Sequence, residues 1–219
     1  MTDKVLKSNT TAEAMSVATM ADATTTGATT AAATATAKPS RGLILVNTGD
    51  GKGKTTASLG VALRAVGNGY RVLILQFIKG GQAYGELTAL EALQKAGMPI
   101  EIRPMGKGFV FHNKETSEAD LQAHRAAADN AWQMLTEEVM SDKWNLIIFD
   151  EINYAVKFGL LPVEQVVDLL KTKPERLHVV LTGRDAKPEI VDMADTVTEM
   201  RVVKHAYQQG IKAARGIEF

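Results

Sequence analysis

One glycine-rich loop constrains this chain more than any other part of its sequence. Residues 48–56 read Thr48-Gly49-Asp50-Gly51-Lys52-Gly53-Lys54-Thr55-Thr56, after the apolar run 43–46 and before the helical stretch 56–64. Such a loop turns several backbone N–H groups toward one point, to which Lys54 adds a cation and Thr55 a hydroxyl. The first turn of the following helix faces the same point. The spacing therefore predicts that Gly49 to Thr56 bind phosphate groups.

The loop departs from the general phosphate-loop pattern at one position. The pattern G-x-x-x-x-G-K-[ST] begins with glycine, whereas this chain has Thr48 there and its first glycine one residue later, at Gly49. The alternative is a flexible turn that binds nothing. We disfavour it because Gly53-Lys54-Thr55 stands between a predicted strand and a predicted helix.

Composition limits the remaining classes of function. The chain has 219 residues, a hydrophobic fraction of 45% and a formal net charge of zero. It is long enough for one ordinary domain with a core, and its charge gives no global attraction to nucleic acid or anionic lipid. The absence of cysteine excludes disulfides, thiolate metal sites and cysteine nucleophiles, and it is compatible with a cytoplasmic protein. No apolar run approaches the roughly 20 residues that span a bilayer.

Residues 1–40 differ from the rest in composition. The stretch 23–37 is almost entirely threonine and alanine, with nothing large to bury. We expect a low-complexity, disordered tail, with the globular domain at 41–219. The tail has no apolar segment typical of a secretory signal, and the first arginine is Arg41, so we expect neither a secretory signal nor an organelle transit peptide.

From residue 41 onward, predicted strands and helices alternate. The strands are 43–47, 71–77, 100–103, 146–150, 177–182 and 196–200, and the helices are 55–67, 85–95, 118–140, 162–173 and 187–193. Most of the strands are continuous apolar runs, which is typical of a parallel sheet covered on both faces. The pattern predicts an α/β fold: an open, mainly parallel sheet flanked by helices, of P-loop NTPase (RecA-like) architecture. Ligands then bind at the carboxyl ends of the strands.

A second motif lies at the same predicted edge of the sheet. The apolar strand 145–149 ends in Asp150-Glu151, the position at which phosphate-loop proteins carry the acids that hold Mg²⁺. These acids and Thr55 are therefore candidate metal ligands. The alternative is that Asp150 or Glu151 only caps the next helix.

Other polar residues follow predicted strands or the loop. Gln76 and Lys79 follow the second strand, Arg184 follows the fifth, and Arg64 lies on the helix after the loop. A guanidinium is a natural phosphate ligand because it is a planar fork of donors. Taken alone, each arginine is better explained as a solvated surface charge or a structural ion pair than as a phosphate ligand.

Two aromatic residues stand in the glycine-rich stretch 106–112, with no core pattern around them. Phe109 and Phe111 either offer an apolar face to a large flat ligand or tuck into the core, and the residues alone do not decide between these. No pair among the four histidines, which include His112 and His205, has the spacing of metal ligands.

Taken together, these motifs resemble one family, the ATP:cob(I)alamin adenosyltransferases of the CobA/CobO/BtuR type. The resemblance covers about residues 41–219. Its segments are Arg41-Gly42, 47–57, Gln76-Phe77-Ile78-Lys79-Gly80, Gly108-Phe109-Val110-Phe111, Phe149-Asp150-Glu151, Thr182-Gly183-Arg184, 194–200, Val203-Lys204-His205-Ala206, 210–213 and 216–219. Thr48 also fits the shortened loop of this family.

The resemblance implies the reaction and its partners. Co(I) of a reduced corrinoid attacks the 5′-carbon of ATP, tripolyphosphate leaves, and adenosylcobalamin or an adenosylated precursor forms. The corrinoid supplies the nucleophile, so the protein's tasks are to position the two substrates and to stabilise the charge that develops on the leaving group. The cofactor is Mg²⁺, with Mn²⁺ as an acceptable substitute. A flavoprotein reductase that donates electrons and a homodimer are implied as well. Residues 1–40 do not resemble the N-terminal helix that folds over the site in family members.

The family's functional residues transfer to matching positions. Lys54 and Glu151 are implied to be catalytic, with Thr55 and Glu151 at the metal and Asp150 close by. Phosphates are assigned to Gly49 through Thr56, and Arg64 is placed near the nucleotide. Phe109 and Phe111, the latter in place of a tryptophan, are implied to lie at the corrinoid. Arg184 and His205 are further candidates for corrinoid or phosphate.

Other functions stay open on the residues alone. One is a phosphate-loop NTPase acting on nucleic acid, which predicts DNA-stimulated ATP hydrolysis; the neutral charge counts against it. A nucleotide-binding regulator without catalysis and a small-molecule kinase are the others, and release of ADP rather than tripolyphosphate would identify the kinase.

Overall fold

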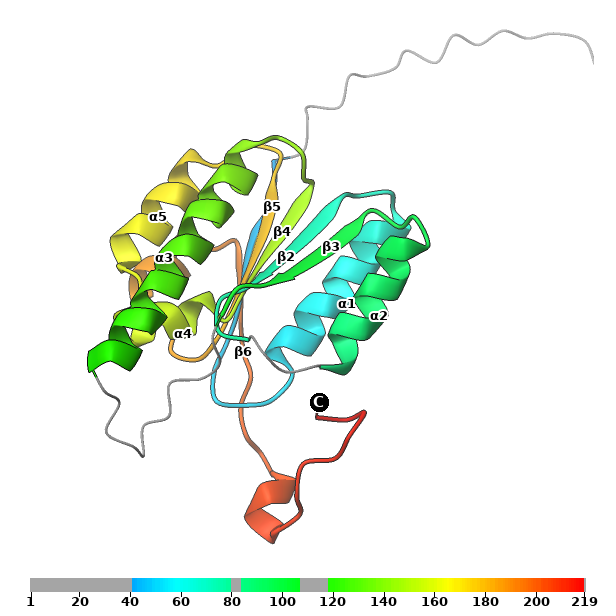
Figure 1. Cartoon of the computed structure of the whole chain (residues 1–219), viewed down its shortest axis with the longest axis vertical. Coiled ribbons are helices and arrows are strands. Elements are labelled where there is room, and N and C mark those ends of the chain that lie inside the picture. The colour runs from blue at the N-terminus through cyan, green and yellow to red at the C-terminus, as the bar shows by residue number, and fades with distance from the viewer. Residues whose placement is uncertain (1–40, 80–83, 107–117, 219) are drawn as a thin grey trace, which may run out of the picture. The chain divides into compact units, whose positions relative to one another are not determined.

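The computed structural model describes residues 41–79, 84–106 and 118–218 (Figure 1). These residues belong to one compact unit, which spans 38–219. The tail predicted for residues 1–40 lies outside the described residues, and so do Phe109, Phe111 and the stretch around them.

Among the described residues, six strands form one parallel sheet. In chain order they are β1 (Ile44–Thr48), β2 (Val72–Gln76), β3 (Ile100–Pro104), β4 (Leu146–Asp150), β5 (His178–Thr182) and β6 (Thr196–Glu199). Their order across the sheet is β3-β2-β4-β5-β1-β6, and all neighbouring pairs run parallel. The loop-bearing strand β1 and the acid-bearing strand β4 are therefore separated by β5, and the predicted open, parallel sheet is confirmed.

Helices cover both faces of the sheet. Their bounds are α1 (Lys54–Gly67), α2 (Gly85–Lys95), α3 (Glu118–Met140), α4 (Ile152–Lys157), α5 (Val163–Thr172), α6 (Pro188–Met193) and the 3₁₀ helix η1 (Ala206–Gln209). Figure 1 shows α1 and α2 on one face and α3, α4 and α5 on the other.

The core divides along the same two faces. Val72 and Ile74 of β2 pack in the cluster that contains Ala62 of α1. Leu73 and Leu75, the alternate residues of the same strand, pack in the cluster that contains α3, α4 and α5. All five residues of β2 are buried, as are all five of β4. Their continuous apolar runs are thus explained by burial on both faces.

The predicted elements agree with the observed ones to within one or two residues at each end. The six-residue helix α4 and the 3₁₀ helix η1 were not predicted. In the part of the chain that the structure describes, no helix is both long and apolar enough to cross a membrane.

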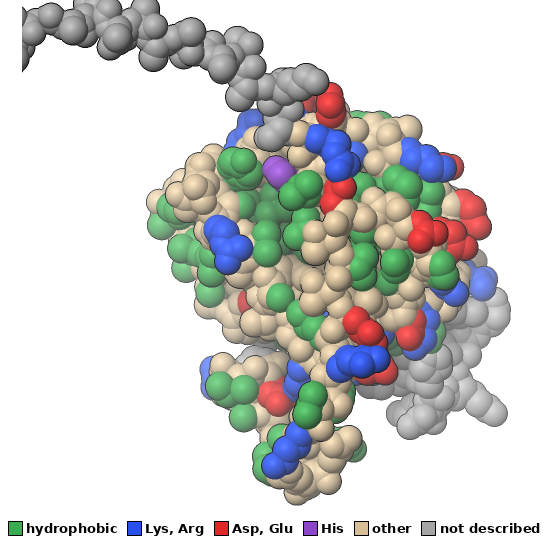
Figure 2. Space-filling view, turned by 180° about the vertical axis from the view of Figure 1, so that it is seen from behind, with side chains coloured by type: hydrophobic (Ala, Val, Ile, Leu, Met, Phe, Trp, Pro, Cys, Tyr) green, Lys and Arg blue, Asp and Glu red, His purple; other side chains and the backbone are tan. Residues whose placement is uncertain are grey.

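After β6 the chain leaves the sheet as a mainly exposed segment, residues 200–218, which we call the arm. In the view from behind, the arm forms a small lobe beneath the main body, with apolar side chains on its surface (Figure 2). Val203, Tyr207 and Ile217 of the arm are at least 80% exposed.

Candidate active site

The phosphate loop packs directly against the beginning of the arm. The Gly51 N–H donates to the Met200 carbonyl at 2.7 Å, and a Cβ on Gly51 would lie 2.7 Å from that carbonyl. Gly53 ends the loop with φ of 104°, in the left-handed region that favours glycine. Gly53, the N-cap residue of α1, provides no side-chain cap, so among the described residues the first N–H groups of the helix are available to an anion.

Lys54 is held inside the loop. Its Nζ donates to the carbonyls of Gly49 and Gly51, both at 2.7 Å, and its side chain is buried. Lys54 shares one stripe of α1 with Ser58, whose hydroxyl donates to the Lys54 carbonyl at 2.9 Å. Burial lowers the pKa of Lys54, although Glu151 opposes this effect. The ammonium is therefore oriented before any ligand arrives.

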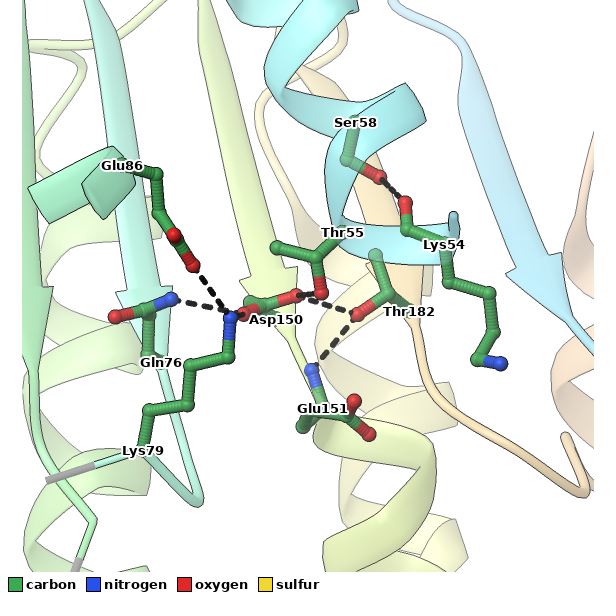
Figure 3. A network of polar contacts seen from close by, with 9 residues as sticks. All are labelled: Lys54, Thr55, Ser58, Gln76, Lys79, Glu86, Asp150, Glu151 and Thr182. Atoms are coloured by element: carbon green, nitrogen blue, oxygen red, sulfur yellow. Dashed lines mark hydrogen bonds and ion pairs between the residues drawn. The ribbon is translucent and has the colours of Figure 1, made fainter. Parts of the chain in front are cut away.

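Asp150 is the centre of a buried polar network at the carboxyl ends of three strands (Figure 3). Its Oδ1 accepts from the hydroxyls of Thr55 and Thr182, each at 2.8 Å. Its Oδ2 accepts from Gln76 Nε2 at 3.0 Å and lies 3.8 Å from Lys79 Nζ. Asp150 is completely buried, so these partners replace the water that an ionised carboxylate otherwise needs.

Lys79 joins this network to the start of α2. Its Nζ donates to Glu86 Oε1 at 2.8 Å and lies 5.0 Å from the centre of the Tyr84 ring. Burial acts to lower the pKa of Lys79, but the carboxylates of Asp150 and Glu86 outweigh it and raise this pKa. Lys79 is therefore a second ordered cation at the site, on the other side of Asp150 from Lys54 (Figure 3).

Glu151 differs from its neighbour Asp150. Its backbone has φ of 62°, and its N–H donates to Thr182 Oγ1 at 2.8 Å. Its carboxylate forms no cap on α4, so the helix-capping alternative is wrong for this residue. Within the described part of the chain, that carboxylate has no hydrogen bond or ion pair. Burial, followed by repulsion from Asp150, raises the pKa of Glu151 from 4.5 to about 6.

These residues surround one cleft of about 700 Å³ at the carboxyl edge of the sheet. Its lining consists of the phosphate loop and the start of α1, the Lys79–Glu86 pair, Glu151 with Tyr154, Arg184, and residues 216–218 of the arm. Arg184 Nε lies 3.9 Å from Asp50 Oδ1, and both side chains are more than half exposed. The cleft thus combines amide donors, cations and carboxylates, as a metal-bound polyphosphate requires.

Two predicted site residues lie away from this cleft. Arg64 is in the last turn of α1, ten residues after Lys54, which is about 15 Å along a helix axis. His205 precedes η1 as its N-cap residue, and its Nδ1 accepts from the Tyr207 N–H at 3.1 Å. It lines a separate cavity of about 330 Å³ beside Lys52 and Glu218. The structure therefore does not bring Arg64 to the loop of its own chain.

The donor set fits Mg²⁺ better than a metal held by protein ligands alone. No cluster of three or more acidic or histidine side chains that could hold a metal exists among the described residues. Thr55, Asp150 and Glu151 instead offer one hydroxyl and two carboxylates beside the loop. Mg²⁺ commonly takes one or two protein carboxylates and completes its shell with phosphate oxygens and water.

Several residues that support the site were named from the sequence without a specific role. Gln76 and Thr182 are the last residues of β2 and β5, and polar residues at the ends of buried strands were the available signal. Glu86 and residues 216–218 carried no such signal, because their place at the cleft depends on tertiary structure.

Comparison with known proteins decides the family. The family model for the ATP:corrinoid adenosyltransferases BtuR/CobO/CobP matches residues 40–219. The chain belongs to this family. Membership favours adenosyl transfer over the nucleic-acid NTPase and the small-molecule kinase.

Similar proteins from three organisms have the corresponding name. The corrinoid adenosyltransferase CobA of Salmonella typhimurium is 40% identical over 183 residues, which cover 84% of this chain and 88% of that protein. A corrinoid adenosyltransferase of Sinorhizobium is 39% identical over 185 residues, with coverage of 84% and 83%. One of Pseudomonas aeruginosa is 38% identical over 183 residues, with coverage of 84% and 86%.

Proposed function

We propose that this protein transfers the 5′-deoxyadenosyl group of ATP to Co(I) of a reduced corrinoid. The Co–C bond forms as the bond between the ribose 5′-carbon and its oxygen breaks, and the electron pair leaves with tripolyphosphate. The observation that carries the proposal is a phosphate loop facing two carboxylates, in a chain of the ATP:corrinoid adenosyltransferase family. The reaction needs no protein nucleophile, because reduced cobalt fills that role.

In this proposal, the loop and its lysine stabilise the leaving group. Lys54 is already oriented by the carbonyls of Gly49 and Gly51, so little reorganisation is needed when charge develops on the tripolyphosphate. The uncapped N–H groups at the start of α1 add further donors. Lys79 and Arg184 line the same cleft and contribute positive charge at its edge.

We further propose that Thr55 and Glu151 hold Mg²⁺, with Asp150 close behind Thr55. Asp150 orients the Thr55 hydroxyl at 2.8 Å, and Glu151 lies at the cleft with its carboxylate uncommitted among the described residues. When bound, Mg²⁺ would supply positive charge that offsets the charge of the leaving group. Mn²⁺ prefers the same hard oxygen ligands and can replace it.

Family membership supports proposals about partners and location. We propose that Phe109 and Phe111 contact the corrinoid, that a flavoprotein reductase supplies electrons to its cobalt, and that the protein is a cytoplasmic homodimer. The net charge of zero gives no support to a nucleic-acid partner.

The test combines purified protein, ATP, Mg²⁺ and chemically reduced cobalamin. We expect a light-sensitive Co–C product and one tripolyphosphate for each adenosyl group transferred. Lys54→Ala serves as the control, with a loss of about 10²-fold or more, on the scale of removing one electrostatic stabiliser. Formation of ADP would instead indicate a kinase, and DNA-stimulated phosphate release would indicate a nucleic-acid NTPase. Product formation no faster than in Lys54→Ala would refute the proposal.

A further inference from the structure

Beyond residue 201, the described part of the arm makes one polar contact with the phosphate loop. Residues 206–211 and 214–218 form local turns whose backbone hydrogen bonds all stay within the arm. Lys52 of the loop pairs with Glu218 of the arm. Within the described ranges, this ion pair is the only hydrogen bond or ion pair between residues 202–218 and the rest of the chain.

This contact lies at the wall of the nucleotide cleft. Gly216, Ile217 and Glu218 all line the cleft that contains Lys54 and Glu151. The Glu218 side chain is only 20% exposed, whereas Lys52 is 54% exposed and Ile217 is 85% exposed. The ion pair therefore places an apolar side chain and a stretch of backbone beside the site, where a ligand can cover them.

We propose that Glu218 is a positioning residue for ATP: its pairing with Lys52 latches the arm against the phosphate loop and makes residues 216–218 a wall of the nucleotide site. The inference rests on the proposed function in taking ATP as the ligand. Without the latch, the arm keeps no described polar anchor beyond residue 201, and the cleft loses this wall.

An opposite effect of Glu218 is also physically conceivable, namely repulsion of the triphosphate. The pairing of Glu218 with Lys52 argues against it, because the ammonium offsets the charge of the carboxylate. Lys54, not Lys52, is the lysine held inside the loop by two carbonyls. Loss of the latch is therefore expected to outweigh the relief of repulsion. The two effects differ in sign, so one binding measurement separates them.

The experiment measures binding of Mg²⁺·ATP by calorimetry, without corrinoid. We expect Glu218→Gln to weaken binding about two- to fivefold, the range for a partly exposed ion pair. Lys52→Met should weaken it at least as much, and the double variant no more than Lys52→Met alone, because the two residues act as one unit. Asp168→Asn, which removes a carboxylate from an exposed pair with Lys171 on α5, is the matched control and should have no effect. Tighter or unchanged binding in Glu218→Gln would overturn the proposal.

A second measurement follows the arm itself. Trypsin can cut after Lys212 and Arg215, which are exposed. We expect Mg²⁺·ATP to slow this cleavage in the unaltered protein, to slow it less in Glu218→Gln, and to slow it substantially again in Glu218→Asp. Equal protection in all three proteins would contradict the latch. Neither measurement uses corrinoid, so failure of adenosyl transfer would count against the proposed function alone.

Discussion

Replacing Glu151 by glutamine is expected to stabilise the ligand-free protein while it impairs catalysis. The Glu151 carboxylate is largely withdrawn from water, lies beside Asp150 and has no hydrogen-bond partner among the described residues. An ionised carboxylate in that position costs free energy of folding, and the neutral amide of glutamine does not have this cost. Such a conflict between stability and function is typical of active-site residues.

The magnitude follows from the raised pKa of Glu151. A rise from 4.5 to about 6 corresponds to about 2 kcal/mol at 1.36 kcal/mol per pKa unit. Below pH 4.5 the group is protonated in both the folded and unfolded states, so it has no differential effect. Between pH 4.5 and about 6 the folded state binds more protons, and stability falls as pH rises. Above that window the full penalty of about 2 kcal/mol persists.

Thermal unfolding in EDTA, without nucleotide, measures this effect. The Tm of Glu151→Gln should match that of the unaltered protein near pH 4 and exceed it by about 4–8 °C above pH 6.5. Asp168→Asn, which replaces an exposed surface carboxylate, is the matched control. Addition of Mg²⁺·ATP should reverse the order, because a bound cation favours ionised Glu151. A Tm difference that is the same at every pH would refute the argument.

Four further outcomes are expected. Gly51→Ala should abolish tight ATP binding and destabilise the protein, because its Cβ would lie 2.7 Å from the Met200 backbone; Gly60→Ala, with nothing within 4 Å of its Cβ on α1, should raise stability by about 0.5–1 kcal/mol in denaturant unfolding. Thr182→Val should lower stability by about 1–3 kcal/mol, because it removes partners of Asp150 and of the Glu151 N–H; an unchanged urea midpoint would contradict this. In the adenosylation assay, Glu151→Gln should reduce turnover by about 10²-fold at limiting Mg²⁺.

The alternation of elements was predictable because the central strands β2 and β4 are buried on both faces. A five-residue run such as 146–150 shows no hydrophobic periodicity, whereas the predicted helices before and after it in sequence do. Together, these patterns predict a sheet covered by helices on both faces. The phosphate loop was predictable for a similar reason, because Gly49 and Gly53 adopt positive φ, which favours glycine.

The rest of the site depends on contacts between residues far apart in sequence. Asp150 and Thr55 are 95 residues apart, and they meet only because β4 ends and α1 begins at the same edge of the sheet. The Lys79–Glu86 pair joins the residues after β2 to the start of α2, a contact that no local pattern predicts. Short helix α4 begins after Glu151 in a left-handed conformation, which local propensity does not favour for glutamate. The position of Arg64 was implied only by resemblance, and the structure places it at the far end of α1.

The adjacent acids Asp150 and Glu151 have different roles in the site. Asp150 already accepts three hydrogen bonds and lies near Lys79, so a metal that bound it directly would have to displace one of these partners from a fully buried position. Glu151 has no such partner among the described residues, and burial and repulsion from Asp150 raise its pKa despite the opposing charges of Lys54, Lys79 and Arg184. A divalent cation offsets the charge of the Glu151 carboxylate. We therefore infer that Glu151 contacts the metal, while Asp150 holds Thr55 and Thr182 in place, and that Asp150→Asn would damage folding more than Glu151→Gln.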